Sequence, residues 1–343
     1  MKKLLNTLYV TTPEAYLSLD GENVVVMHDN KELGRMPLHL LDGIVTFTYP
    51  GISPGLMGKC AEMGKTVTFL SPNGRFLSRS VGKTYGNVIV RRTQYRMADD
   101  PQKSLHIASC MISAKLTNSA AVLRRAVSDH EARLDAGAVR ETAVLLKQNA
   151  VAAFSAMNAE SLRGLEGESA NRYFDQFDSL ILQQKDVFSF NRRNRRPPMD
   201  PVNALLSFGY SLMTSTCSAA LETAGLDPYV GFFHTERPGR ASLALDLVEE
   251  FRAPFVDRFV LTLINKRLLS DSDFAFKEDG AVLLTDEGRR EFLKQWQKKK
   301  QEEIEHPYLK EKVAWGMVPF VQAQLLAKYI RGDLDDYPPY LWK

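Results

Sequence analysis

The pattern of hydrophobic residues changes once along this chain, near Arg91, and that change limits the folds open to it. Before Arg91, short runs rich in β-branched and aromatic residues are separated by turn sequences, which is typical of strands. Residues 53–64 differ, because they combine a serine cap, an early proline and helical spacing. We therefore predict that residues 1–90 form a small N-terminal β-domain with one packed helix.

The chain beyond Arg91 is helical in pattern. Residues 91–103 are polar, charged and interrupted by Pro101, so we interpret them as an inter-domain linker. From residue 104 to 343, most segments carry apolar residues at spacings of three and four, as amphipathic helices do. Residues 274–284 instead predict a small hairpin with a glycine turn. The sequence thus predicts an α+β protein, in which the β-domain precedes a larger all-α catalytic domain.

The composition excludes several classes of protein. With 44% hydrophobic and 25% charged residues, the chain has the balance of an ordinary soluble globular protein. No apolar run is long enough to cross a membrane, and no signal-peptide cleavage pattern follows the N-terminal lysines. The 3 cysteines are widely spaced, which excludes a disulfide framework and a zinc motif. We therefore expect a cytoplasmic protein without a membrane partner.

One candidate site lies in residues 234–252, where a histidine on a turn-rich loop is followed by two acidic residues on a predicted helix. Asp246 and Glu249 are three positions apart, so their side chains project from nearly the same helix face. If His234 returns to that face, one nitrogen and two carboxylates could bind a divalent cation with open coordination positions. A solvated helix surface beside an ordinary histidine is the alternative interpretation.

A second candidate is Glu166, which lies between Gly164 and Gly167 in an otherwise helical segment. Each of these glycines costs the helix about 1 kcal/mol relative to alanine. Such a cost suggests that another backbone or a ligand approaches closely, with Glu166 directed into a cleft between helices. The alternative is that the glycines only allow two helices to pack tightly and leave Glu166 at the rim.

A third candidate is a basic loop before a helix that begins near Pro201. It contains four arginines within five positions and no acidic residue: Arg192, Arg193, Arg195 and Arg196. A guanidinium can bond two phosphate oxygens and stays charged, so the loop suits a nucleic-acid backbone, although a solvated loop is the alternative. The net charge of +3 is too small to indicate a polyanionic partner by itself. No motif for a protein nucleophile is present.

These three stretches, in this order behind a β-domain, resemble the CRISPR-associated spacer-acquisition integrases, a family of metal-dependent adaptation proteins. The resemblance covers essentially the whole chain, and the final YPPYLWK is similar to the type I-C form. It places the family's catalytic and metal-binding positions at Glu166, His234, Asp246 and Glu249. Glu250 remains an alternative to Glu249. The resemblance also implies a Mg²⁺ or Mn²⁺ cofactor and contact of the four loop arginines with DNA.

The activity implied by the resemblance is the insertion of a short DNA duplex, the new spacer, into a CRISPR repeat. A DNA 3′-hydroxyl would attack a repeat phosphodiester, so the nucleophile would come from the substrate. The implied partners are this double-stranded DNA, a second copy of the chain bound through the β-domain, and a small second adaptation subunit in a heterohexamer, with a trimming nuclease as a further candidate. Two alternatives stay open: a metal-dependent nuclease or resolvase of branched DNA, and a non-catalytic architectural DNA-binding protein.

Overall fold

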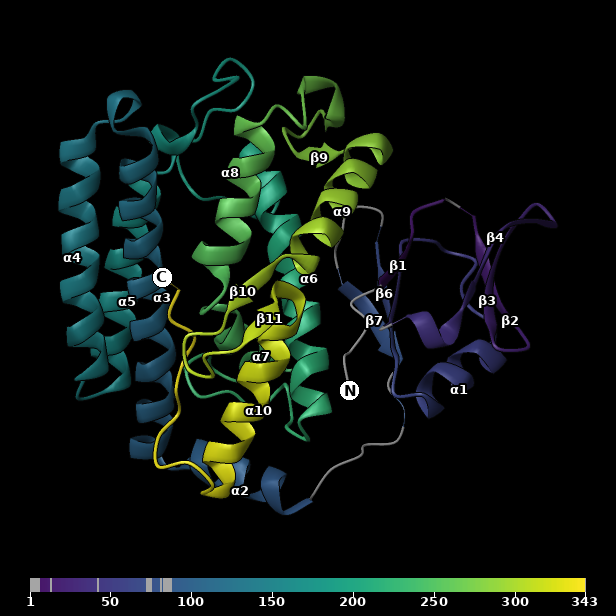
Figure 1. Ribbon diagram of the computed structural model, residues 1–343, viewed down its shortest axis with the longest axis horizontal. Helices are drawn as coiled ribbons and strands as arrows, with labels where there is room; N and C mark the ends of the chain where they lie inside the picture. Colours follow the sequence, from purple (N-terminus) through teal and green to yellow (C-terminus); the bar gives the residue numbers. More distant parts are fainter. Residues whose placement is uncertain are drawn as a thin grey trace.

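The structure, a computed structural model, describes residues 7–12, 14–41, 43–71, 76–80, 82 and 88–342. The strands of residues 7–80 lie on one side of the molecule together with one helix, and the other side is built mainly of helices (Figure 1). The predicted α+β fold class is therefore confirmed. Within the described residues, none of the helices is both long and apolar enough to span a membrane.

The N-terminal part contains two sheets. In the first, three strands run parallel and the last is antiparallel, in the order β1 (Thr7–Val10), β5 (Gly43–Thr46), β6 (Thr66–Leu70) and β7 (Phe76–Ser80). The second is an antiparallel meander of β2 (Tyr16–Asp20), β3 (Asn23–His28) and β4 (Lys31–Pro37). The sequence around β4 predicts a turn rather than a strand. The strand is exposed along almost its whole length, so it lacks the apolar signal that identifies a strand.

The predicted helix of the β-domain is confirmed as α1 (Pro54–Glu62). Its first turn is capped by Ser53, whose Oγ accepts a hydrogen bond of 3.2 Å from the backbone nitrogen of Leu56. Leu56 and Cys60 are buried on one face of α1, in a small core shared with the two sheets. This core is separate from the larger core of the helical part.

The second part is mainly helical, but it contains two strand pairs. Its helices are α2 (Val88–Asp99), α3 (Pro101–His130), α4 (Ala136–Phe154), α5 (Ala159–Asp175), α6 (Pro201–Thr223), α7 (Ser242–Val248), α8 (Arg258–Asn265), α9 (Asp286–Gln301) and α10 (Val318–Arg331). The predicted hairpin is confirmed as β8 (Phe274–Phe276) and β9 (Val282–Leu284). A second pair, β10 (Glu303–Glu305) with β11 (Lys312–Ala314), was not predicted, so this part is mostly rather than entirely helical.

Residues 91–103, which we predicted as a linker, are helical. They belong to α2 and to the first turn of α3. Pro101 begins α3 rather than interrupting it, because proline is well tolerated at the first position of a helix. Asp100 caps that turn by accepting hydrogen bonds from the backbone nitrogens of Gln102 (3.0 Å) and Lys103 (3.2 Å). The polar sequence therefore marks a solvated helix and a cap.

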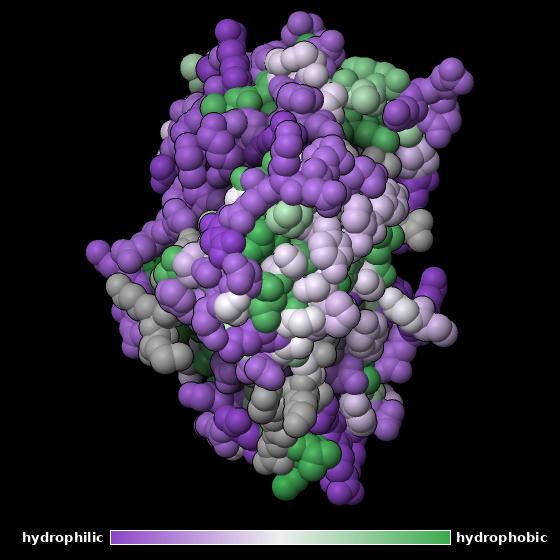
Figure 2. Space-filling view, turned by 90° about the vertical axis from the view of Figure 1, so that its right-hand side faces the viewer, coloured by the Kyte–Doolittle hydropathy of each residue, from purple (hydrophilic) through white to green (hydrophobic). Residues whose placement is uncertain are grey.

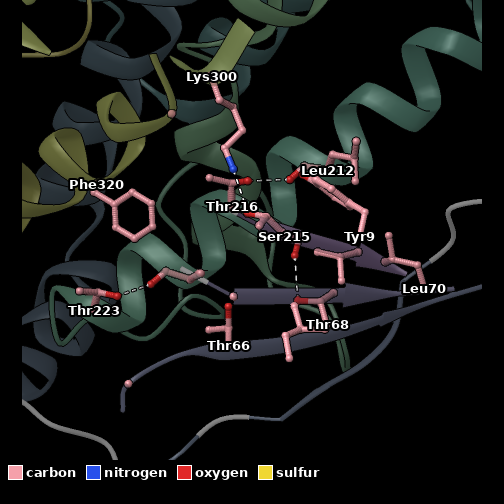
Figure 3. A pocket seen from close by; sticks show the side chains of 17 residues that line it. Tyr9, Thr66, Thr68, Leu70, Leu212, Ser215, Thr216, Thr223, Lys300 and Phe320 are labelled. Carbon is pink, nitrogen blue, oxygen red and sulfur yellow. Dashed lines mark hydrogen bonds between the residues drawn. The ribbon is translucent and has the colours of Figure 1, made fainter. Parts of the chain in front are cut away.

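The four-stranded sheet meets the helical part through a partly polar interface. Phe47 and Leu70 extend from the sheet into the large core. Beside them, hydroxyl-bearing side chains of the sheet and of α6 line a cavity of about 80 Å³ (Figure 3). Thr68 Oγ1 lies 3.3 Å from Ser215 Oγ across this cavity. None of the predicted site residues lines it.

Candidate active site

His234 is held in place by the carboxylate of Asp246, which is completely buried on α7. Asp246 Oδ1 lies 2.7 Å from His234 Nδ1 and accepts a 2.9 Å hydrogen bond from the backbone nitrogen of His234. Asp246 Oδ2 accepts hydrogen bonds from the backbone nitrogens of Phe232 (2.7 Å) and Phe233 (3.0 Å). The loop is thus wrapped around this carboxylate, and His234 Nε2 is the ring nitrogen left for a cation.

Gly231 allows this loop to come close to α7. A Cβ added at Gly231 would lie 2.8 Å from Ser242 Cβ and 2.9 Å from Asp246 Oδ2, which is too close for any larger residue. Gly231 was not among the residues predicted for the site. The signal that could have identified it was a glycine just before the aromatic residues that precede the histidine.

Glu166 and Glu249 come from separate elements and meet at the amino group of Lys115. Glu166 lies on α5, Glu249 directly follows α7, and Lys115 lies in the middle of α3. Lys115 Nζ donates a hydrogen bond to Glu166 Oε1 and lies 2.7 Å from Glu249 Oε2. On its other side, Glu249 Oε1 accepts a 2.8 Å hydrogen bond from Arg252 Nη1. Two carboxylates that are far apart in sequence therefore surround one positive charge.

Glu249 is ionised at this site. Burial raises the pKa of its carboxyl group, but the charges of Arg252, Lys115 and His234 outweigh burial and hold this pKa well below its usual range. Glu249 Oε2 is buried and lies 2.7 Å from Lys115 Nζ, which is its ion-pair partner. A cation could take this oxygen as a ligand.

Glu250, the alternative to Glu249, is directed away from Glu166. Its Oε1 accepts a 2.6 Å hydrogen bond from the Tyr337 hydroxyl, and its Oε2 accepts hydrogen bonds from Tyr340 N (2.7 Å) and Gln322 Nε2 (3.0 Å). Burial raises the pKa of Glu250 to about 7. Glu250 therefore fastens the 337–342 segment, which runs back along α3 (Figure 1).

The four predicted residues thus form two pairs, His234 with Asp246 and Glu166 with Glu249. No three of them bring ligand atoms within 4.8 Å of one another, because Lys115 lies between the glutamates and Asp246 is engaged by the loop. In the described part of the chain, the ligand atoms of one different group do lie within 4.8 Å of one another: His106, Cys110 and Asp336. There His106 Nε2 lies 2.7 Å from Asp336 Oδ1. The pKa of Cys110 is raised to about 12, mainly by burial, which makes its thiol a poor ligand.

The arginine loop is fixed by Asn203 at the start of α6. Asn203 Nδ2 donates a 2.9 Å hydrogen bond to the backbone oxygen of Arg192, and its Oδ1 accepts one from Arg193. Arg193 also donates a 3.0 Å hydrogen bond to Ser207, so its side chain points inward. Arg192, Arg195 and Arg196 are all exposed. The structure therefore separates one internal arginine from three that are accessible to a phosphate backbone.

A stack of charged and aromatic groups joins this loop to the glutamate pair. The guanidinium carbons of Arg193 and Arg252 lie 5.4 Å and 4.3 Å from the centre of the Tyr210 ring. The Tyr210 hydroxyl donates a hydrogen bond to the buried Asp257, whose pKa burial raises to about 6. Arg252 is also the hydrogen-bond donor to Glu249, so the loop and the acidic site share one network.

The chain is similar to known proteins over its whole length. The family model for CRISPR associated protein Cas1 matches residues 8–298. A CRISPR-associated endonuclease Cas1 of Rhodospirillum rubrum is 48% identical over 350 residues, which cover 100% of both chains. A solved casposase bound to its integration product has a TM-score of 0.82 at 24% identity, covering 99% of this chain and 95% of that one. A solved Cas6-RT-Cas1–Cas2 complex has a TM-score of 0.81 at 22% identity, and the match covers 100% of this chain and 36% of that one.

The two solved structures are less than 25% identical to this chain, so they show only a shared fold. The family model and the full-length relative match the amino-acid sequence itself. A match to most of the chain, together with nearly half identity over its full length, places this protein in the Cas1 family of CRISPR-associated endonucleases.

Proposed function

We propose that this Cas1 protein inserts a DNA duplex into a CRISPR repeat by metal-dependent transesterification. The observation that carries the proposal is that Glu166 and Glu249 meet at the amino group of Lys115, a position that a cation could take, while Asp246, one helical turn before Glu249, holds His234. A relative named as an endonuclease and a casposase solved with its integration product support DNA strand chemistry on this fold.

The residues at this position fit Mg²⁺ or Mn²⁺. Glu166, Glu249 and the Nε2 atom of His234 would hold the ion, since hard oxygen ligands with one imidazole suit these metals. The observation that supports the fit is that the Glu166 and Glu249 carboxylates are already arranged around one positive group, Lys115 Nζ. When bound, such an ion polarises the phosphoryl oxygen and stabilises charge on the leaving oxygen. Asp246 would act by holding His234, because both of its oxygens already accept hydrogen bonds.

The chain's own residues would position the reacting DNA. The 3′-oxygen of the incoming strand forms a bond to phosphorus, the bond from phosphorus to the repeat's 3′-oxygen breaks, and the proton passes from the attacking hydroxyl to the leaving oxygen through solvent. Arg192, Arg195 and Arg196 would hold the phosphate backbone, since such contacts dominate affinity and orientation. Arg193 would support the loop from inside.

The assembly that we infer is a homodimer through the β-domain, joined by a small second subunit in the way that Cas1 and Cas2 share the similar Cas6-RT-Cas1–Cas2 complex. The side of the molecule that carries the strands shows hydrophobic patches near its centre (Figure 2). Large apolar side chains of this part are exposed at Tyr16, Leu33, Met36, Leu40, Phe76 and Leu77. Exposed apolar surface of this kind is typical of a protein interface. The YPPYLWK segment supports the type I-C form, and a trimming nuclease remains a candidate partner.

The decisive experiment offers a labelled duplex with free 3′-hydroxyls and a supercoiled plasmid carrying a CRISPR repeat, with the small subunit, in Mn²⁺ or in EDTA. We expect joined products in Mn²⁺ alone, and none from the Glu249→Gln or Glu166→Gln variant. Cleavage of the plasmid without joining would favour the nuclease or resolvase of branched DNA. Binding without either reaction would favour the architectural protein.

A further inference from the structure

Lys115 is an unusual residue for its position. Its neighbours Ala114 and Leu116 on α3 are buried, and its own relative exposure is 9%. A lysine in such surroundings is stable only when its charge is paired. Here the pairing is double, since the same amino group contacts both Glu166 and Glu249.

We propose that Lys115 is the built-in counter-ion of the Glu166–Glu249 pair, that a divalent cation displaces it, and that its ammonium group then binds a DNA phosphate. This inference rests on the proposed function, because it takes the two glutamates as metal ligands. It assigns to Lys115 a role that links metal binding to DNA binding.

The charges at the site support this order of events. Without metal, the two glutamates are balanced by Lys115 and Arg252, which form three close ion pairs with them. A divalent cation between the carboxylates would repel the ammonium and leave two excess positive charges in a poorly hydrated site. Such excess charge is costly unless an anion arrives, and a DNA phosphate is the anion that the reaction brings. Metal and DNA should therefore each strengthen the binding of the other.

The geometry allows Lys115 to move. A lysine carries its charge on a flexible four-carbon chain, so the ammonium can turn without moving α3. Of its two partners, the Glu249 side chain is 4% exposed and the Glu166 side chain is 24% exposed, so the site opens to solvent beside Glu166. The ammonium can leave by that side, where a DNA backbone would also enter.

The test measures Mn²⁺ binding directly, by electron paramagnetic resonance on the full chain without DNA. Lys115→Met removes the competing cation, so we expect Mn²⁺ to bind at least about tenfold more tightly than to the unmodified protein. The matched control is Lys300→Met, because Lys300 is similarly buried at 8% exposure but donates to Thr7 in the β part. The control should bind Mn²⁺ as the unmodified protein does. Unchanged or weaker Mn²⁺ binding by Lys115→Met would overturn the proposal.

A second measurement tests the link to DNA, with a duplex that lacks 3′-hydroxyls so that no joining occurs. Adding Mn²⁺ should raise the duplex affinity of the unmodified protein and of Lys300→Met, and this gain should be lost in Lys115→Met. An equal gain in Lys115→Met would contradict the role in DNA binding. If Lys115→Met does not fold, Lys115→Arg decides: a guanidinium holds carboxylates more firmly, so Mn²⁺ should bind more weakly, and equal binding would refute the proposal.

Failure of this inference is distinguishable from failure of the proposed function. Glu249→Gln should weaken Mn²⁺ binding whatever Lys115 does. If it does not, the metal site itself is misplaced. If it does while Lys115→Met leaves Mn²⁺ affinity unchanged, only the counter-ion role is wrong.

Discussion

Asp246 Oδ1 contacts both the ring Nδ1 and the backbone nitrogen of His234, at 2.7 Å and 2.9 Å. One buried carboxylate therefore sets the orientation of the imidazole and the path of its loop together. The role that we propose for Asp246 is exerted through His234, and this differs from direct coordination in a way that experiments can detect.

Asp246→Asn should disturb the loop, because an amide cannot accept hydrogen bonds at both positions that now face backbone donors. We expect a loss of about ten- to a hundredfold in Mn²⁺ affinity, together with a lower melting temperature. Metal titration and thermal unfolding measure the two effects. Asp129→Asn, which changes an exposed aspartate paired with Arg125, is the control and should alter neither. A full loss of joining at normal Mn²⁺ affinity would argue against the supporting role.

The glycines beside Glu166 face open space, so the interpretation that they permit tight helix packing was wrong. A Cβ added at Gly164 or Gly167 would meet no described heavy atom within 4 Å. Each alanine substitution should therefore stabilise the fold by about 1 kcal/mol. If DNA approaches α5 on this side, the same substitutions should weaken duplex binding severalfold.

Chemical denaturation and duplex titration together test this prediction. The contrasting control is Gly209→Ala, whose Cβ would lie 2.7 Å from Val256 Cγ1 and should destabilise the fold. Unchanged duplex affinity in both α5 variants would remove this face of the helix from the DNA path.

The loop arginines should divide into two classes. Arg195→Ala and Arg196→Ala should weaken DNA binding evenly across sequences, and each should reduce the slope of log affinity against log salt by about 1. Arg193→Ala should instead lower the melting temperature, because its side chain holds Asn203 and Ser207. Salt-dependent duplex titration and thermal unfolding distinguish the classes. A normal melting temperature for Arg193→Ala would contradict its internal role.

Glu250 should make the protein less stable as pH rises from about 5 to 7. Its folded-state pKa of about 7 lies above its ordinary value of 4.5, so between these values the folded state binds more protons than the unfolded state. Stability then falls as pH rises through this window, by on the order of 1–3 kcal/mol from this group. Asp257, with its pKa raised to about 6, acts in the same direction.

Denaturant unfolding at pH 5, 6 and 7 measures this dependence. Glu250→Gln cannot ionise, so its stability should fall less over this range than that of the unmodified protein, although its absolute stability changes as well. The difference between the two slopes isolates Glu250 from histidines that titrate nearby. Equal slopes would show that Glu250 is ionised throughout.

The sequence was informative wherever a local pattern has a local cause. The change near Arg91 separated strands from helices. The cap at Ser53 and the proline at Pro201 marked the starts of two helices. The hydrophobic pattern did not identify β4, because this strand is exposed and carries few apolar residues. It also did not identify α2, because this helix is largely polar. A π-helical turn, Arg252–Asp257, separates α7 from α8, and Glu249 directly follows α7 at this break.

The candidate site was predictable only in part, because its long-range pairings have no local signal. The three motifs identified Glu166, His234 and the acidic pair, but no spacing indicated which carboxylate would face inward. Lys115 could have been noticed as a charge within a long, mainly apolar stretch of α3, residues 107–123. Its partners, however, lie 51 and more positions away, and only the folded chain shows them.

Glu249 and Glu250 are adjacent in sequence, but their side chains bind different parts of the molecule. The first faces the proposed reaction centre, while the second is bound to Tyr337, 87 positions later in the chain. A change that loosens the 337–342 segment should therefore alter the position of the backbone that carries Glu249, a proposed metal ligand. The C-terminal segment therefore contributes to the position of Glu249 without contacting it.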